Sequence, residues 1–266
     1  MSQITVLSLD NLEAAKITLG KIRDNKGGLG KNANIPYNGG RFNLALGGTR
    51  FPFGATAKPA EYRQGDRDQF TMQCEISKTQ TEKLEALDQR MIDCCLASEE
   101  FLTVMKLNGK QRCREVVESK YFSLLKYSKD KDGKIKTEYN PTIRVAIPNG
   151  SGEKSDGFNC DFFLSKNGTS SQVAMVDQPT SENHITKMIG AGSTGAVLLT
   201  CSLWISSSGF GITLKASQIK VEHIERQTRS LCLLDDFLKP SSASKPIKAS
   251  SSTIDEDEDL MSEISE

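Results

Sequence analysis

Two stretches of the chain combine basic residues with aromatic rings and contain no acidic residue. Residues 25–60 hold five bases, and residues 183–221 hold three. Lysine and arginine bind phosphates and aromatic faces stack on nucleobases, so this combination is typical of single-strand nucleic-acid binders. It marks as candidate DNA-binding residues Arg41, Arg50, Phe51, Phe53, Lys58, Trp204, Lys215 and Lys220. The alternative for the phenylalanines is a place in the hydrophobic core.

Trp204 is the only tryptophan of the chain, and its strand places it on a polar face. Apolar residues at the odd positions of 199–205 alternate with threonine, serine and Trp204 at the even positions, as in a half-buried strand. A turn at 206–209 then starts a hairpin whose register sets Gly211 across from Trp204 and Lys215 across from Thr200. The ring is therefore a candidate nucleobase platform, with packing under a loop as the alternative.

Charge is distributed unevenly along the chain. The whole sequence has 34 basic and 34 acidic residues, but residues 239–266 hold three lysines and seven acids, which leaves 31 bases and 27 acids in residues 1–238. A flexible acidic arm tethered to a basic surface competes with any polyanion for the same lysines and arginines. The candidate regulatory residues are Asp255, Glu256, Asp257, Glu258, Asp259, Glu263 and Glu266. The alternative is a tail that only keeps the protein soluble.

Three motifs resemble ligand-binding loops, and each lacks a required feature. Residues 190–195 match GxGxxG, but a helix is expected before them and a strand after them, the reverse of a dinucleotide site. Residues 128–133 resemble a calcium loop, but Ser128 and Tyr139 stand where two carboxylate ligands belong. Residues 25–31 lack the first glycine of a phosphate loop. We therefore expect no metal site and no cofactor.

No motif indicates catalysis. His184 and His223 lack a local Ser/Asp or Cys/Asn arrangement that would mark a triad. The only dense acidic cluster, residues 255–259, lies in the tail, where it cannot be preorganised to hold a metal for a nuclease. We therefore do not expect an enzyme.

Cysteine usage indicates free thiols. The seven cysteines are an odd count without a CxxC motif, so neither a disulfide framework nor a zinc site is expected. No apolar run approaches the ~20 residues that a bilayer span needs, and the N-terminal sequence is not that of a secretory signal. The expected location is a reducing, intracellular compartment without membrane attachment.

The pattern of apolar residues indicates one α+β domain, mainly β, with one long helix and one or two short ones. Capping-box spacing at Thr79 and Glu82 predicts the start of the long helix, which runs to about Leu96. Shorter helices are expected at 112–120 and 181–189. Strands are expected at 121–127, 142–147, 159–164, 197–206 and 210–221, and residues 27–48 are expected to form a loop or an irregular strand entry.

The order of several features resembles one family. Gly-Thr-Arg-Phe-Pro-Phe-Gly stands at 48–54, Leu-Glu-Ala-Leu-Asp at 84–88 and Tyr-Asn-Pro-Thr-Ile-Arg-Val at 139–145, before the hairpin at 203–221 and the acidic tail. In this order the chain is similar to the single-stranded DNA-binding proteins of nucleocytoplasmic large DNA viruses. Those proteins are similar in turn to the phage replication protein that has an OB fold and an acidic C-terminal tail. The resemblance covers residues 40–266, and the hairpin is its most specific part.

The resemblance implies an OB-like β-barrel over residues 1–238, with 1–39 as an irregular N-terminal part. A flexible linker at 239–252 and a disordered acidic tail at 253–266 would follow. It implies sequence-independent binding of single-stranded DNA in viral DNA replication, recombination and repair, and it adds Tyr127 and Arg144 to the candidate interface. The tail would occupy the DNA groove and contact a DNA polymerase, helicase or primase, in the host cytoplasm, a viral replication factory or the nucleus. A homodimer stays open.

One departure from the family pattern concerns the end of the tail. Phage tails of this kind end in an aromatic residue, whereas this chain ends with Leu260, Met261 and Ile264 among polar residues. Partner docking would then use these apolar side chains or not occur in that form. The alternative function is a virion-associated or scaffold protein that uses the acidic tail to bind basic partners. It predicts no base stacking and no dependence on Trp204.

Overall fold

The computed structural model describes residues 4–25, 30–59, 61, 69–150, 157–166, 168–175 and 184–222. By its internal contacts the chain divides into two units, Met1–Ile224 and Glu225–Glu266. The expected linker at 239–252 and the acidic tail lie outside the described residues. No helix within the described ranges is long and apolar enough to span a bilayer.

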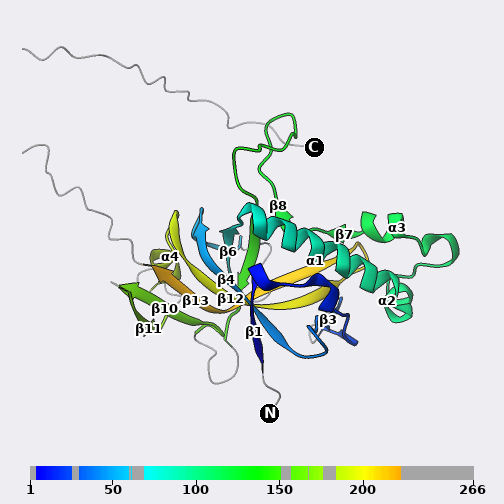
Figure 1. Ribbon diagram of the computed structural model, residues 1–266, viewed down its shortest axis with the longest axis horizontal. Helices are drawn as coiled ribbons and strands as arrows, with labels where there is room; N and C mark the ends of the chain where they lie inside the picture. Colours follow the sequence, from blue (N-terminus) through cyan, green and yellow to red (C-terminus); the bar gives the residue numbers. More distant parts are fainter. Residues whose placement is uncertain are drawn as a thin grey trace, which may run out of the picture. The chain divides into compact units, whose positions relative to one another are not determined.

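One mixed sheet dominates the first unit (Figure 1). Its main path runs through β1 (Thr5–Ser8), β4 (Phe42–Phe51), β12 (Ser193–Ile205), β13 (Phe210–Glu222), β9 (Thr142–Ile147), β6 (Phe70–Glu75) and β5 (Ala55–Ala57). In the described ranges four further strands pair with this path: β3 (Lys31–Asn34), β7 (Tyr121–Phe122), β8 (Leu125–Lys126) and β10 (Asp161–Lys166). Two more pair with these, β2 (Ile22–Asp24) with β3 and β11 (Thr169–Val173) with β10. The strands expected near β9, β10, β12 and β13 are confirmed, with ends shifted by a few residues.

The sheet curls until two strands far apart on this path come together. The Thr49 hydroxyl of β4 donates a hydrogen bond of 2.8 Å to the Glu75 carbonyl of β6. Beside it, Arg50 Nη1 lies 3.9 Å from Glu75 Oε2. Because β4 pairs with β1 and β12 and also meets β6, the strands enclose a common interior. The architecture is α+β with an OB-like core, as expected.

The long helix α1 (Lys78–Leu96) buries the residues that its periodicity predicts, among them Leu84, Leu87 and Met91. Its start differs from the expected one. The cap is Ser77, whose hydroxyl accepts from the Gln80 amide while the Gln80 side chain accepts from the Ser77 amide. This box forms two residues before the expected one at Thr79, because Ser77 is extended and a glutamine at the third helical position can reach back to it.

The described ranges also contain three short α-helices, α2 (Glu99–Val104), α3 (Arg114–Ser119) and α4 (Ile185–Met188), and three 3-10 turns, η1 (Leu9–Asn11), η2 (Ala14–Lys16) and η4 (Gly109–Gln111). The two expected at 112–120 and 181–189 match α3 and α4, with residues 181–183 outside the described ranges. The sequence analysis missed α2. Its start has a clear cap, since the Ser98 hydroxyl accepts from the Phe101 amide at 3.2 Å.

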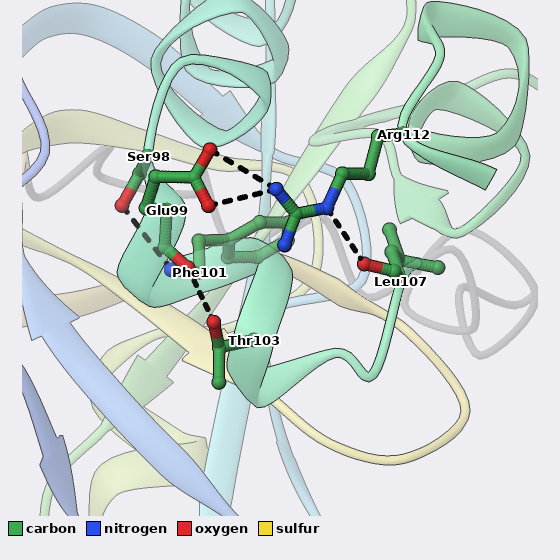
Figure 2. A network of polar contacts seen from close by, with 6 residues as sticks. All are labelled: Ser98, Glu99, Phe101, Thr103, Leu107 and Arg112. Atoms are coloured by element: carbon green, nitrogen blue, oxygen red, sulfur yellow. Dashed lines mark hydrogen bonds and ion pairs between the residues drawn. The ribbon is translucent and has the colours of Figure 1, made fainter. Parts of the chain in front are cut away.

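A polar network fixes α2 and the turn after it (Figure 2). Arg112 Nη1 donates to both Glu99 oxygens, at 3.1 and 2.8 Å, and Arg112 Nε donates to the Leu107 carbonyl at 3.1 Å. Phe101 is fully buried, and its ring meets the edge of the Phe210 ring at 4.7 Å between centroids. The network therefore supports the residue at which β13 begins.

The described part of the segment 27–48, residues 30–48, is more regular than expected. It contains all of β3 and most of β4, where Ala33, Leu44 and Leu46 are buried. Gly39 and Gly40 lie in the turn between β3 and β4, where Asn38 and Gly39 have φ of 53° and 76°. Gly47 and Gly48 lie within β4 itself, so glycines in this segment do not prevent a regular strand.

The expected strand at 121–127 also differs, because it is two short strands. β7 pairs with β13, whereas β8 pairs with β9. The break at Ser123 and Leu124 coincides with hydrogen bonds from both residues to the side chain of Asp88. A contact with α1 thus interrupts the strand.

The cysteines in the described ranges are unpaired: Cys74, Cys94, Cys95, Cys113, Cys160 and Cys201. Burial raises the pKa of the Cys74 and Cys160 thiols to about 12. Both therefore stay protonated in the native protein at neutral pH.

The glycines at 190–195 have a structural role. They follow α4 and lead into β12, the order that the sequence predicts. A Cβ on Gly195 would lie 2.0 Å from the Lys220 carbonyl oxygen and 3.1 Å from the ring of Phe51. Gly195 is thus needed where β12 and β13 approach closely.

We expect Gly195→Ala to lower the free energy of unfolding by about 1–3 kcal/mol, because the added carbon overpacks the close approach. Urea denaturation followed by circular dichroism measures the change. Gly190→Ala is the matched control, because a Cβ there meets no atom of the described structure within 4 Å. Equal stability of the two variants would contradict the close approach at Gly195.

Candidate nucleic-acid interface

The hairpin of β12 and β13 has the register that the sequence predicts. Trp204 pairs with Gly211, Ser202 with Thr213 and Thr200 with Lys215. The inward face is closed, with Leu203 at 0% and Ile205 at 2% exposure. Trp204 lies on the opposite, outward face and is half-buried.

Strand pairing places Trp204 in a row that crosses five strands. Its neighbour on one side is Asn32 of β3, which pairs in turn with Arg23 of β2. On the other side Gly211 pairs with Phe122 of β7. Paired residues project on the same side of a sheet, so these five residues share the outward face.

Trp204 and Phe122 form an aromatic pair over Gly211. Their ring centroids lie 5.4 Å apart with an angle of 47° between the planes. Phe122 is 52% exposed, so this pair offers ring surface to the solvent while Trp204 also packs. Trp204 therefore packs against a neighbouring strand, and its role as a nucleobase platform stays a prediction.

Two glycines make room for the aromatic pair. A Cβ on Gly209 would lie 2.6 Å from Phe122 Cε2, and one on Gly211 would lie 2.8 Å from the Phe122 carbonyl oxygen and 3.1 Å from Trp204 Nε1. A larger residue at either position would displace Phe122 from the tryptophan.

Two bases lie on the same outward face. Lys215 is exposed, opposite Thr200 on one side and Ala146 of β9 on the other. Arg144 is exposed two residues before Ala146 and therefore points the same way. A hollow of about 330 Å³ beside Lys215 is lined also by Pro148, Asn159, Cys160, Asp161, Thr200, Ala216 and Ser217.

Lys220 lies farther along β13 on the outward side, half-buried between Ala196 of β12 and Phe163 of β10. Tyr127 follows β8, and its hydroxyl donates to Glu85 Oε1 at 2.9 Å. Burial and the Glu85 carboxylate raise the pKa of Tyr127. Both residues have protein neighbours, and neither contributes to the aromatic row.

Two candidates from the first stretch, Arg50 and Phe53, lie toward the end of β12 opposite Trp204. Arg50 pairs with Thr194 near the opposite end of β12, ten residues from Trp204 or about 30 Å of strand. Phe53 follows in the turn after β4 and is 60% exposed. Arg41 precedes β4, where its carbonyl accepts from Thr5 of β1, and Lys58 follows β5.

Phe51 needs a correction. It is 0% exposed and belongs to the core, so its ring is not accessible to a nucleobase. Its strand alternates buried and exposed residues, and the inward position of Phe51 follows that of Leu44 and Leu46 across a bulge at 195–197. The core alternative is the right one for this phenylalanine.

Phe122 was missed by the sequence analysis. Its sequence gives no local signal, because its place depends on β7 pairing with β13, more than 80 residues later. The glycines at positions 209 and 211 are the best available signal in the sequence. They indicate that another group approaches the strand closely, but they do not identify that group as Phe122. The acidic tail residues lie outside the described structure.

Comparison with known proteins gives only remote matches to solved structures of phage proteins. No family model and no curated protein matches the chain. Among solved structures, the single-stranded DNA-binding protein of bacteriophage Enc34 in complex with single-stranded DNA has 16% identity and a TM-score of 0.38, covering 77% of this chain and 94% of that one. The single-stranded DNA-binding protein gp2.5 of bacteriophage T7 has 13% identity and a TM-score of 0.38, covering 77% and 98%.

We expect Phe122→Ala to increase acrylamide quenching of Trp204 fluorescence, because it removes the ring that covers one side of the indole. The chain has a single tryptophan, so the emission reports this site alone. Phe53→Ala, another exposed phenylalanine but at the far end of β12, is the matched control and should leave quenching unchanged. Unchanged quenching in Phe122→Ala would contradict the aromatic pair.

Proposed function

We propose that this chain binds single-stranded DNA on the outward face of the β12–β13 hairpin. The observation that carries the proposal is the aromatic pair, Trp204 and Phe122, which is partly exposed on a sheet face that also holds Lys215 and Arg144. Stacking platforms beside bases are the combination that single-strand binders use.

The two kinds of group have separate roles. The rings would stack on successive bases, and this contact tolerates any sequence because every base has a π-face. Lys215 and Arg144 would hold the phosphates beside them. Lys215 lies four residues from Gly211 along β13, about 13 Å, so one short stretch of nucleic acid can reach both groups. The function is binding without catalysis.

We further propose a role in viral DNA replication, recombination and repair, as in the large DNA viruses whose proteins the sequence resembles. The acidic tail would compete with DNA and bind a polymerase, helicase or primase. Residues 239–266 have an excess of acids and residues 1–238 have an excess of bases, and these opposite charges support the competition. The matching location is the host cytoplasm, a viral replication factory or the nucleus.

Titration with oligo-dT tests the proposed function. We expect oligo-dT to bind more tightly than duplex of equal length, with log K falling against log salt by about 0.7 per phosphate neutralised. Binding should quench Trp204 fluorescence. Trp204→Ala should weaken binding by about 1–3 kcal/mol, the usual loss for one stacked base, with an unchanged circular dichroism spectrum. Phe53→Ala should weaken it less, because that ring lies at the other end of β12.

Two results would contradict the binding proposal. Affinity that is flat between about 50 and 200 mM salt would remove the phosphate contacts. An affinity that Trp204→Ala leaves unchanged would favour the scaffold alternative, in which the tail binds basic proteins.

Deletion of residues 239–266 should tighten binding to oligo-dT at about 50 mM salt, because it removes acids that compete for the bases. The gain should shrink as salt screens both partners. A full-length variant with the seven acids changed to amides is the matched control and should behave like the deletion. Equal affinity with and without the tail would leave it a solubility device.

A further inference from the structure

Asp88 is a buried carboxylate that the proposed binding face does not use. It lies on α1 with 5% exposure. Its Oδ1 accepts from the Tyr121 hydroxyl at 2.5 Å, and its Oδ2 accepts from the Ser123 hydroxyl at 2.7 Å and from the Leu124 amide at 3.1 Å. All three donors come from one segment of four residues, 121–124.

The residue in the middle of this segment is Phe122. Its neighbours Tyr121 and Ser123 both donate to Asp88, so the backbone on each side of the exposed ring is held from the interior. The Tyr121 ring also packs against the Phe210 ring at 5.2 Å, where β7 pairs with β13. Asp88 thus holds the segment through which β7 pairs with the hairpin.

Burial and hydrogen bonding act in opposite directions on the Asp88 carboxyl. Burial raises the pKa of the Asp88 carboxyl, although the Tyr121, Ser123 and Leu124 hydrogen bonds lower it. A buried ionised group is disfavoured unless several donors satisfy it. β7 itself is only two residues long, so pairing with β13 alone gives it little support.

We propose that Asp88 is a positioning residue that holds Phe122 against Trp204, so that the interior of the fold sets the geometry of the base-stacking surface. The effect on DNA affinity rests on the proposed function, whereas the effect on the ring pair does not. Asp88 makes no contact with nucleic acid in this role and acts through the segment 121–124.

Asp88→Ala removes all three acceptors, and Asp88→Asn provides the contrast. The asparagine oxygen can still accept from Ser123 and Leu124, and its amide can donate to the Tyr121 oxygen. Both variants remove the carboxyl group, and Asp88→Asn keeps the side-chain volume and the hydrogen-bonding capacity that Asp88→Ala loses. Asp93→Ala is the matched control, because Asp93 lies on the same helix and binds Arg114 of α3.

The first measurement uses no DNA. Acrylamide quenching of Trp204 should rise in Asp88→Ala toward the value of Phe122→Ala, stay near wild type in Asp88→Asn and not change in Asp93→Ala. If Asp88→Ala does not fold, Ser123→Ala serves instead, because Ser123 is exposed and supplies one of the three donors. Its quenching should lie between wild type and Phe122→Ala. If the variant that folds, Asp88→Ala or Ser123→Ala, shows the same quenching as the wild type, the proposal is overturned.

The second measurement is oligo-dT affinity. Phe122→Ala should weaken binding about 5- to 150-fold, the range for one stacked base, and Asp88→Ala by up to that factor. The double variant should bind within about twofold of Phe122→Ala alone, because both changes remove the same contact. When Asp88→Ala is combined with Lys215→Ala instead, the two fold-losses in affinity should multiply. Multiplication with Phe122→Ala would show that Asp88 acts elsewhere and would overturn the proposal.

The two proposals fail in different ways. If Phe122→Ala and Trp204→Ala both leave affinity unchanged, the DNA-binding proposal fails, and the quenching result still decides the role of Asp88. If both weaken binding while Asp88→Ala does so no more than Asp88→Asn, the binding face stands and the positioning role is wrong.

Discussion

The long pairing of β12 with β13 is the interaction on which the rest of the structure depends. The two strands have 13 residues each, and they carry β3, β4, β7, β9 and β10 on their free sides. The side-chain period of a strand is two, so a slip by one residue would send Leu203 and Ile205 outward and Trp204 into the core. The burial of the apolar face therefore fixes the register, and the register fixes which residues can meet a ligand.

The register of the β12–β13 hairpin could be predicted because it depends on the alternation of apolar residues and on the residues of the turn. Trp204, Gly211, Thr200 and Lys215 pair as the sequence predicts, since the hairpin is a contact between neighbours in the chain. Phe122 could not be predicted, because it reaches the row only through a two-residue strand from a distant segment. Phe51 shows a different limit. Basic residues near it in the sequence do not indicate whether its ring on β4 faces inward.

The same limit applies to the start of α1 and to the existence of α2. A capping box can begin at more than one serine or threonine, and it forms at Ser77 because Ser77 is extended and Gln80 reaches back to it. The helix α2 is too short for a periodic pattern to reveal it, and it is held by the Ser98 cap and by Arg112 from outside the helix. Short elements of this kind depend on specific polar contacts more than on propensity.

The position of Asp88 resolves a difficulty that any stacking surface on a sheet has. A ring that stacks on bases must be exposed, so few apolar contacts remain to hold it, and the entropy of its side chain opposes an ordered position. Packing Phe122 more deeply would order it but would hide the ring. Holding the backbone on both sides of Phe122 from beneath, by hydrogen bonds to one buried carboxylate, orders the segment while the ring stays at 52% exposure. The cost of burying the carboxyl is thereby placed in the interior, where three donors offset it, and the proposed binding surface keeps its open face.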